Sequence, residues 1–420
     1  MKTSSYSGFF KLSTEDRMKE IAEFCGLSEA EQAILQNADS LDMDKADHMI
    51  ENVIGRFTLP MGVGINFVIN GKDYVIPMVT EEPSVVAACS NAAKMARPGG
   101  GFTTDYTGSV MISQIQLLDV PAPFYAKGKI LENKEKIAEI CNAKDPMLVK
   151  LGGGVKDVEV RVLDSLVGPM VVVHLLVDTG DAMGANAVNT MAEAVAPFLE
   201  ELTGGRAELR ILSNLADHRI ARARAVFKKD AIGGEEVVDK MIAAYAFAAA
   251  DPYRAATNNK GIMNGVIPVV IATGNDTRAI ESGAHAYAAR SGQYSPFATW
   301  EKNADGDLVG SIEMPMAVGL VGGATKIHPA AKVAVKMLGV KTAGELAQII
   351  AAVGLAQNMA AMRALATEGI QRGHMSLHAR NLAATAGATG EVLEKIVKQM
   401  VAEKNVRLEY AQELLKQYQK

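Results

Sequence analysis

One segment of this 420-residue chain carries a complete alternation of strand and helix patterns. Strand-like runs at 110–120, 158–163, 170–178 and 207–212 are interleaved with helix-like runs at 127–142 and 185–202. The resulting order, β-α-β-β-α-β, is that of the ferredoxin-like or split βαβ fold. Because three glycines at 99–101 break the chain just before this segment, we expect residues 108–215 to form a compact domain inserted into a larger one.

The flanking segments predict a large mixed α/β domain made by residues 1–107 and 216–373. Asn70-Gly71 joins strand-like runs at 65–69 and 74–79, and this dipeptide is the strongest short-range signal for a β-hairpin. Helices are expected over 85–95, 217–253, 277–289, 328–338 and 342–370, and a short strand over 266–272. The predicted fold class is therefore α/β (α+β). After an interruption at Gly373-His374-Met375, residues 374–420 predict a helical C-terminal flap.

The composition excludes several classes of function. The net charge is −5 and the pI is near 5.9, so the chain lacks the basic character that binds nucleic acid or anionic membranes. Cys25, Cys89 and Cys141 are far apart, which is typical of a reducing compartment and provides neither a disulfide framework nor zinc-ligand spacing. The most apolar run, 241–250, is too short to cross a bilayer. We therefore expect a cytoplasmic protein that binds no nucleic acid, membrane or metal.

Two turns rich in Asn and Gly surround the expected strand at 266–272. The first contains Lys260 and the second contains Asp276. Such a strand spans only about 23 Å, so the two charges could meet if the loops fold back toward each other. A surface salt bridge between two loops is the simpler interpretation. The density of Asn and Gly around both residues favours a functional site.

Two further residues are candidates for acid–base chemistry. Glu82 lies at a corner between a strand and a helix, where it is either a catalytic carboxylate or a solvated charge at a helix start. His374 is an isolated histidine between Gly and Met, and it either has a structural role or titrates near neutral pH beside the flap. Zinc binding through His374 and His378 is rejected because no acidic third ligand is near.

Two segments of the expected inserted domain are candidates for binding a dinucleotide. Residues 181–186, which read Asp181-Ala182-Met183-Gly184-Ala185-Asn186, lie between a strand and a helix. A helix N-terminus offers free N–H groups to phosphate oxygens, although an ordinary helix cap explains the pattern equally well. Asp145 either ends a helix as Asp-Pro or binds two ribose hydroxyls and repels a 2′-phosphate.

Six motifs together resemble 3-hydroxy-3-methylglutaryl-CoA (HMG-CoA) reductases. They are Glu51-Asn52-Val53-Ile54-Gly55, Glu81-Glu82-Pro83-Ser84, the run 181–186, Asn259-Lys260-Gly261, Gly274-Asn275-Asp276 and Gly373-His374-Met375. The match covers nearly the whole chain in the right order, and the lack of a membrane region makes it similar to the class II, bacterial and archaeal form. The resemblance implies an HMG-CoA-binding large domain, an inserted dinucleotide-binding domain and a C-terminal flap. It also implies a homodimer with interfacial active sites, with a trimer of dimers as a further assembly.

The resemblance also implies a reaction and the residues that perform it. HMG-CoA, two NAD(P)H and two protons would give mevalonate, CoA and two NAD(P)⁺ through a hemithioacetal and mevaldehyde. Lys260 would stabilise the oxyanion, and Asp276 would join Lys260 to Glu82. Glu82 would protonate mevaldehyde, and His374 would protonate the departing CoA thiolate.

The remaining roles concern binding. Ser84, Arg254 and Asn264 match positions that hold the HMG carboxylate and hydroxyl. Asp181, Met183, Gly184, Ala185 and Asn186 match the turn that binds the cofactor phosphates. Asp145 matches the position whose carboxylate favours NADH in some members of the family, and on charge alone we expect NADH to be preferred, although Lys144 and Lys150 could still receive the 2′-phosphate of NADPH. Two alternatives stay open: a CoA-thioester transferase or lyase without redox chemistry, and a catalytically silent CoA- or nucleotide-binding protein.

Overall fold

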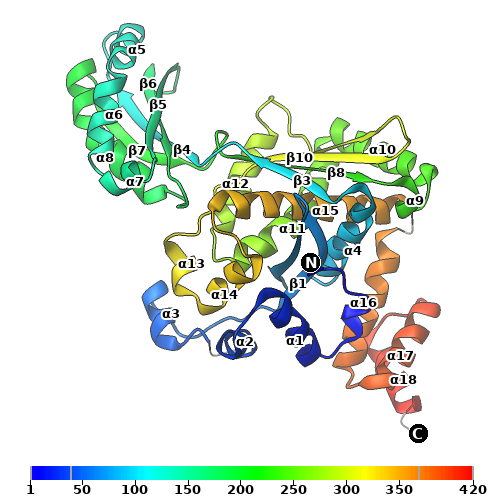
Figure 1. Cartoon of the computed structure of the whole chain (residues 1–420). Coiled ribbons are helices and arrows are strands. Elements are labelled where there is room, and N and C mark those ends of the chain that lie inside the picture. Colours follow the sequence, from blue (N-terminus) through cyan, green and yellow to red (C-terminus); the bar gives the residue numbers. More distant parts are fainter. Residues whose placement is uncertain (1, 38–39, 368, 419–420) are drawn as a thin grey trace.

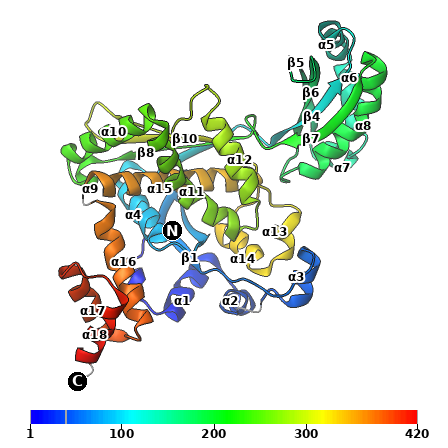
Figure 2. The same cartoon turned by 180° about the vertical axis from the view of Figure 1, so that it is seen from behind.

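The computed structural model describes residues 2–37, 40–367 and 369–418, without the side chains of residues 370–377. Its strands form a six-stranded sheet and a four-stranded sheet. Figures 1 and 2 show that the smaller sheet and its helices project from the main body, to which strand β4 connects them.

The six-stranded sheet has the order β2-β1-β3-β8-β10-β9. Its strands are β1 (Met61–Ile69), β2 (Lys72–Val79), β3 (Phe102–Tyr106), β8 (Ile220–Phe227), β9 (Ala298–Lys302) and β10 (Leu308–Pro315). The predicted hairpin between β1 and β2 is confirmed, with Ile69 paired to Lys72. Asn70 and Gly71 both have positive φ, as a tight type I′ turn requires.

Long helices cover this sheet and form the core. They are α4 (Val85–Ala96), α10 (Glu235–Ala250), α11 (Pro252–Ala272) and α15 (Ala343–Ala366). Helix α15 packs against α4, α11, β3, β8 and β10. It is long and apolar enough to cross a membrane, but most of it is buried inside the fold, as expected for a core helix.

Shorter elements complete the main body. They are η1 (Phe9–Lys11), α1 (Thr14–Cys25), α2 (Glu29–Gln36), α3 (Met43–Met49), η2 (Arg97–Gly99), α9 (Lys229–Ile232), α12 (Thr277–Ala288), α13 (Gly323–Ile327) and α14 (Pro329–Leu338). At the C-terminus, α16 (Ile370–Thr385), α17 (Gly390–Ala402) and α18 (Leu408–Tyr418) enclose an apolar cluster of their own, which includes Ala383, Ile396 and Leu414.

The smaller unit has the β-α-β-β-α-β arrangement that the sequence predicts, except that three helices replace the single helix expected in the first crossover, and the predicted fold class is confirmed. Its elements are β4 (Val110–Leu118), α5 (Pro123–Glu132), α6 (Lys134–Asn142), α7 (Pro146–Lys150), β5 (Gly154–Leu163), β6 (Met170–Asp178), α8 (Ala185–Thr203) and β7 (Arg206–Ser213). The sheet order is β5-β6-β4-β7. Helices α5 and α6 both contact α8 and pack with it on one face (Figure 1).

Three local predictions were wrong. Residues 252–272 are not a turn followed by a strand, because α11 runs unbroken from Pro252 to Ala272, whereas the second expected turn, at 274–276, is present between α11 and α12. Residues 217–253 are not all helical, because β8 occupies 220–227 with alanines inside and Arg222 and Arg224 on the other face. The helical pattern is not interrupted at Gly373-His374-Met375, since α16 begins at Ile370. The proposed boundary at 374 falls inside α16, and the division into 1–107 with 216–373, 108–215 and 374–420 stays a prediction.

Candidate functional site

A cavity of about 290 Å³ lies where the start of α4 meets α11 and α15. We call it the α11 pocket. Five predicted site residues line it, namely Glu82, Ser84, Arg254, Lys260 and Asn264. Arg254, Lys260 and Asn264 belong to α11, and Lys260 and Asn264 share a face of the helix because they are four residues apart. One helix thus carries most of the polar groups of the pocket.

Glu82 and Lys260 form an ion pair at the mouth of this pocket. Lys260 Nζ lies 2.9 Å from Glu82 Oε2, and Asn264 Nδ2 donates to Glu82 Oε1 at 3.2 Å. The side chains of Lys260 and Glu82 are 62% and 35% exposed, so both can reach a molecule that enters the pocket. The pair places an ammonium donor and a carboxylate proton carrier side by side.

Two buried polar atoms in the pocket wall have no hydrogen-bond partner among the described residues. They are Ser84 Oγ and Gln357 Oε1. Ser84 also has a φ of 79°, an unfavourable conformation for a residue other than glycine. Unsatisfied buried polar groups are costly, so a ligand that supplies their hydrogen bonds gains affinity. Sequence reasoning missed Gln357, although the polar pair Gln357-Asn358 inside an apolar helix was an available signal.

Buried amides hold α11 in place. Trp300 Nε1 donates to Asn358 Oδ1 at 2.7 Å, and Asn358 Nδ2 donates to Asn258 Oδ1 at 3.0 Å. Asn259 accepts from the backbone N–H of Phe297 at 3.0 Å and donates to a backbone carbonyl, that of Ser295. These side chains satisfy each other inside the fold, so the asparagines that suggest a turn are instead compatible with a helix.

Within the described part of one chain, Asp276 makes no contact with Lys260 or Glu82, so its expected link between them stays a prediction. Asp276 caps α12, and its carboxylate pairs with Arg278 at 3.1 Å. The Arg278 guanidinium holds the pKa of this carboxyl below its usual range. The helix from Lys260 to Ala272 alone extends about 18 Å, and no described contact joins Asp276 to the α11 pocket.

The predicted dinucleotide segment lies outside the α11 pocket, at the junction of the two sheets. We call residues 179–184 the β6–α8 turn. Gly184 precedes α8 with a φ of 99°, and no side chain caps the N–H groups at this helix start. Met183 is half-buried, while Ala185 and Asn186 open the helix. The first N–H groups of α8 are therefore available to an anion.

The main body holds this turn from several sides. Asp181 Oδ1 accepts from the backbone N–H of Ala343 at 2.7 Å, and its carbonyl accepts from Leu320 at 2.8 Å. The neighbouring Gly319 donates to Asn275 Oδ1 at 2.7 Å. Asn275 precedes Asp276, so the predicted cofactor segment and Asp276 belong to one region, and Lys260 with Glu82 to another.

Asp145 lies at the same end of the small sheet as the β6–α8 turn. It caps α7, where its Oδ1 accepts from Leu148 at 2.9 Å. The chain then enters β5 at Gly154, which pairs with Asp178 at the end of β6. His374 lies in α16, and its side chain falls outside the described part of the structure.

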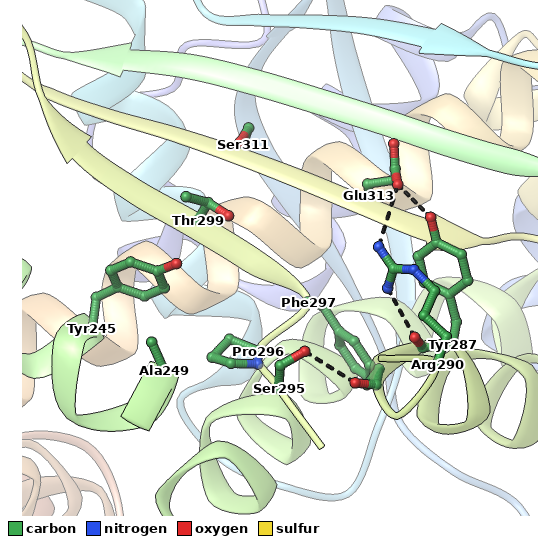
Figure 3. A pocket seen from close by; sticks show the side chains of 11 residues that line it. Tyr245, Ala249, Tyr287, Arg290, Ser295, Pro296, Phe297, Thr299, Ser311 and Glu313 are labelled. Carbon is green, nitrogen blue, oxygen red and sulfur yellow. Dashed lines mark hydrogen bonds and ion pairs between the residues drawn. The ribbon is translucent and has the colours of Figure 1, made fainter. Parts of the chain in front are cut away.

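A second cavity, of about 420 Å³, lies between α10, the end of α12 and strands β9 and β10. Figure 3 shows Arg290, Tyr287 and Glu313 pointing toward one another there. Their charges are already paired, because Glu313 also accepts from Arg222 at 2.7 Å and Arg290 lies over the Tyr287 ring. Among the described residues that line this cavity, none has a buried polar side-chain atom without a hydrogen-bond partner.

Sequence comparison identifies the relatives of this chain. A profile of the family described as hydroxymethylglutaryl-coenzyme A reductase matches residues 13–379. The chain is 62% identical over 414 residues to a 3-hydroxy-3-methylglutaryl-coenzyme A reductase of Archaeoglobus fulgidus, with 98% of this chain and 94% of the relative covered. It is 37% identical over 402 residues to a probable reductase of the same name from Borreliella burgdorferi, with 91% and 89% covered.

Solved structures extend the match to the fold. A 3-hydroxy-3-methylglutaryl-coenzyme A reductase from Streptococcus pneumoniae is 41% identical with a TM-score of 0.85, covering 99% of this chain and all of its own. The class II enzyme from the same organism, bound to NADPH in open conformations, is also 41% identical with a TM-score of 0.83, covering 97% and 100%. Because sequence and fold agree over nearly the whole chain, this protein belongs to the hydroxymethylglutaryl-coenzyme A reductase family, in its class II form.

Proposed function

We propose that this chain interconverts HMG-CoA with mevalonate and CoA by two successive hydride transfers from NAD(P)H. The intermediates are a hemithioacetal and then mevaldehyde. The observation that carries the proposal is the pair formed by Lys260 and Glu82 in the α11 pocket, with 2.9 Å between Nζ and Oε2. This pair supplies the two groups that stepwise reduction of a thioester needs, a cationic donor and a proton carrier.

Lys260 acts on the reacting carbonyl. An ammonium has three N–H donors, and only one is needed for Glu82. The others are free to stabilise the oxyanion that forms when hydride reaches the carbonyl carbon. A fixed donor of this kind is worth about 3–4 kcal/mol in the transition state. Glu82 then protonates the mevaldehyde oxygen, and Asn264 keeps the carboxyl in place.

The same pocket suits the acyl group of HMG-CoA. Arg254 and Ser84 provide donors for its carboxylate, since guanidinium and hydroxyl groups bind carboxylates well. Gln357 Oε1 has no hydrogen-bond partner in the described part of the chain and can accept from the tertiary hydroxyl. His374, near the start of the C-terminal helices, protonates the CoA thiolate and so prevents it from adding back to the aldehyde.

The dinucleotide binds at the β6–α8 turn. The free N–H groups at the start of α8 suit its phosphates, and Asp181, Met183, Gly184, Ala185 and Asn186 form the contact. The S. pneumoniae relative is bound to NADPH. For this chain we propose that NADH is preferred and NADPH accepted, because the Asp145 carboxylate repels a 2′-phosphate. No metal takes part in this scheme.

The working unit is a homodimer with active sites at the interface. In one chain the α11 pocket and the region of Asp276 are separated by most of α11. A second copy that presents its β6–α8 turn and Asp276 to the α11 pocket completes the site. The segment around Ile54 and Phe57, 100% and 90% exposed, is apolar and suits such an interface. Dimers assemble further into a trimer of dimers, in the cytoplasm.

Steady-state kinetics test this function. The purified chain is given HMG-CoA with NADH or NADPH, and then mevalonate and CoA with NAD⁺ or NADP⁺, and the nicotinamide absorbance is followed. We expect two reduced cofactors to be consumed for each HMG-CoA, with a higher kcat/KM for NADH. Thioester cleavage without cofactor oxidation would instead indicate a transferase or lyase.

A further inference from the structure

Arg219 is a fully buried arginine at the junction of the two sheets, directly before β8. Its Nε donates to the Tyr106 hydroxyl at 2.6 Å. Its Nη1 donates to Thr179 Oγ1 at 3.1 Å and to the carbonyls of Ala182 and Met183 at 3.1 and 3.2 Å. Its Nη2 donates to the carbonyl of Val318. One side chain therefore joins both connections between the sheets to the β6–α8 turn.

All these partners are neutral. No described carboxylate forms an ion pair with Arg219, and the two nearby aspartates are engaged elsewhere. Asp181 Oδ1 accepts from the N–H of Ala343, and Asp178 Oδ1 accepts from the N–H of Gly180. A buried charge without a counter-ion is unfavourable unless another group compensates it. Among the described residues, the charge of the guanidinium is therefore balanced by neutral hydrogen-bond acceptors alone, without a counter-ion.

The position of that charge suggests what compensates it. The guanidinium binds the Ala182 and Met183 carbonyls, and α8 begins two residues later at Ala185. The positive end of the α8 dipole and the buried guanidinium therefore add at one place. At low local dielectric such a field attracts an anion strongly.

We propose that Arg219 is a positioning residue for the dinucleotide, acting in two ways. It fixes the β6–α8 turn against the main body, and its charge raises the affinity of the α8 N-terminus for the diphosphate. The inference rests on the proposed function, because it assumes that the diphosphate binds at this turn. Arg219 makes no direct contact with the cofactor, since it lies behind the turn and is fully buried.

Two substitutions at Arg219 distinguish the effect of its charge from the effect of the hydrogen bonds that hold the β6–α8 turn. Arg219→Met removes the charge, while Arg219→Lys keeps it but loses most of the hydrogen bonds. The matched control is Arg222→Met, three residues on, where the arginine is partly exposed and forms ion pairs with Glu313 and Asp105. Calorimetry measures the binding of ADP-ribose, which contains the diphosphate, and of reduced nicotinamide mononucleotide, which lacks it.

We expect Arg219→Met to weaken ADP-ribose binding about 10- to 100-fold, with a smaller loss in Arg219→Lys and none in Arg222→Met. Mononucleotide binding and the KM for HMG-CoA should stay within about twofold of wild type. If affinity fell equally for ADP-ribose, the mononucleotide and HMG-CoA, Arg219 would have only a structural role, and the inference would be wrong. Wild-type affinity for ADP-ribose in a folded Arg219→Met variant would also overturn the inference.

If both Arg219 variants fail to fold, a less disruptive substitution at Tyr106 can still test the inference. Tyr106→Phe removes only the hydroxyl that accepts from Nε, and it should weaken ADP-ribose binding several-fold with the KM for HMG-CoA unchanged. An unchanged ADP-ribose affinity there would overturn the inference. If the wild-type chain bound neither ADP-ribose nor NADH, the proposed function itself would fail, which is a different outcome.

Discussion

The α11 pocket and the β6–α8 turn are built in opposite ways. The pocket presents partly exposed charged side chains, Lys260 from the long helix α11 and Glu82 from the connection between β2 and α4. The turn presents backbone N–H groups, and its shape depends on buried groups behind it, such as Arg219. Reacting atoms of the pocket can therefore be removed without disturbing the fold, whereas the turn is sensitive to residues that no ligand touches.

The two regions also differ in what they lack. Within the residues that the structure describes, the predicted dinucleotide segment does not line the α11 pocket, and the β6–α8 turn has Asp276 nearby but no lysine–glutamate pair. Each is half of the chemistry that the family performs. Variants that damage one half at a time can show whether the halves meet across two chains.

Subunit complementation should give the largest effect. Lys260→Ala removes the oxyanion donor and should lower kcat at least about 10²- to 10³-fold, and Asp276→Asn should be similarly inactive. If each site takes Lys260 from one protomer and Asp276 from the other, a heterodimer of the two variants has one intact site. An equal co-expression should recover about a quarter of wild-type activity, given two-fold symmetry.

The control mixes the two variants after separate purification, without subunit exchange, and should stay inactive. No recovery in verified heterodimers would mean that both residues serve the same chain's site. Substantial activity of Lys260→Ala alone would contradict the oxyanion role. NADH affinity of that variant, measured by fluorescence, should be unchanged, since the turn is untouched.

Alanine substitutions at two glycines of the β6–α8 turn should have an effect of intermediate size on the KM for cofactor. A Cβ on Gly184 would lie 2.3 Å from Thr179 Cγ2, and the residue has a φ of 99°. Gly180, in the same turn, has open space around it and a φ of 58°. Gly184→Ala should raise the KM for cofactor at least about tenfold with the KM for HMG-CoA little changed, because the turn must shift. Gly180→Ala should cost only about 1 kcal/mol of stability.

Thermal unfolding and kinetics on both variants provide the measurement. If the two alanines raised the cofactor KM equally, backbone conformation rather than the close approach to Thr179 would control the turn. A rise in the KM for HMG-CoA alone would mean that the turn does not bind the dinucleotide.

The smallest effect concerns cofactor choice. Asp145 caps α7 through a side-chain oxygen, and its negative charge is proposed to repel the 2′-phosphate of NADPH. Asp145→Asn keeps the capping oxygen and removes the charge, whereas Asp145→Ala loses both and about 1 kcal/mol of helix stability. Both should narrow the ratio of kcat/KM for NADH to that for NADPH by up to about tenfold. An unchanged ratio in the asparagine variant would eliminate Asp145 as the selector.

Local signals account for what the sequence predicts correctly. Asn70-Gly71 fits the positive φ angles of a tight turn, and the strand–helix alternation over 108–215 reflects a self-contained sheet with helices on one face. Helix α11 was missed because Asn258 and Asn259 have a low helix propensity, and only the distant Asn358 and Phe297 make them acceptable. Strand β8 was missed although its alternating alanines and arginines show the period of a strand.

In the candidate site, too, local motifs predict which residues take part, whereas contacts between distant residues could not be predicted. Motifs predict Glu82, Ser84, Arg254, Lys260 and Asn264, and the structure brings these five residues to one cavity. Motifs carry no information on distance, so they could not reveal that Asp276 pairs with Arg278 within one chain and lies apart from these five residues. Gln357 and Arg219 were missed because their importance arises from burial, which depends on the whole fold.

The continuity of α11 sets a limit on how this chain can vary in length. The helix bears Lys260 near one end, and the loop after its other end leads to Asp276. Inserting or deleting one residue between them would turn one end by about 100° and move it about 1.5 Å relative to the other. Either change would uncouple Asn275 from Gly319 or Lys260 from Glu82. The length of α11 therefore fixes the distance between these two contacts. We expect the helix to tolerate substitutions better than insertions or deletions.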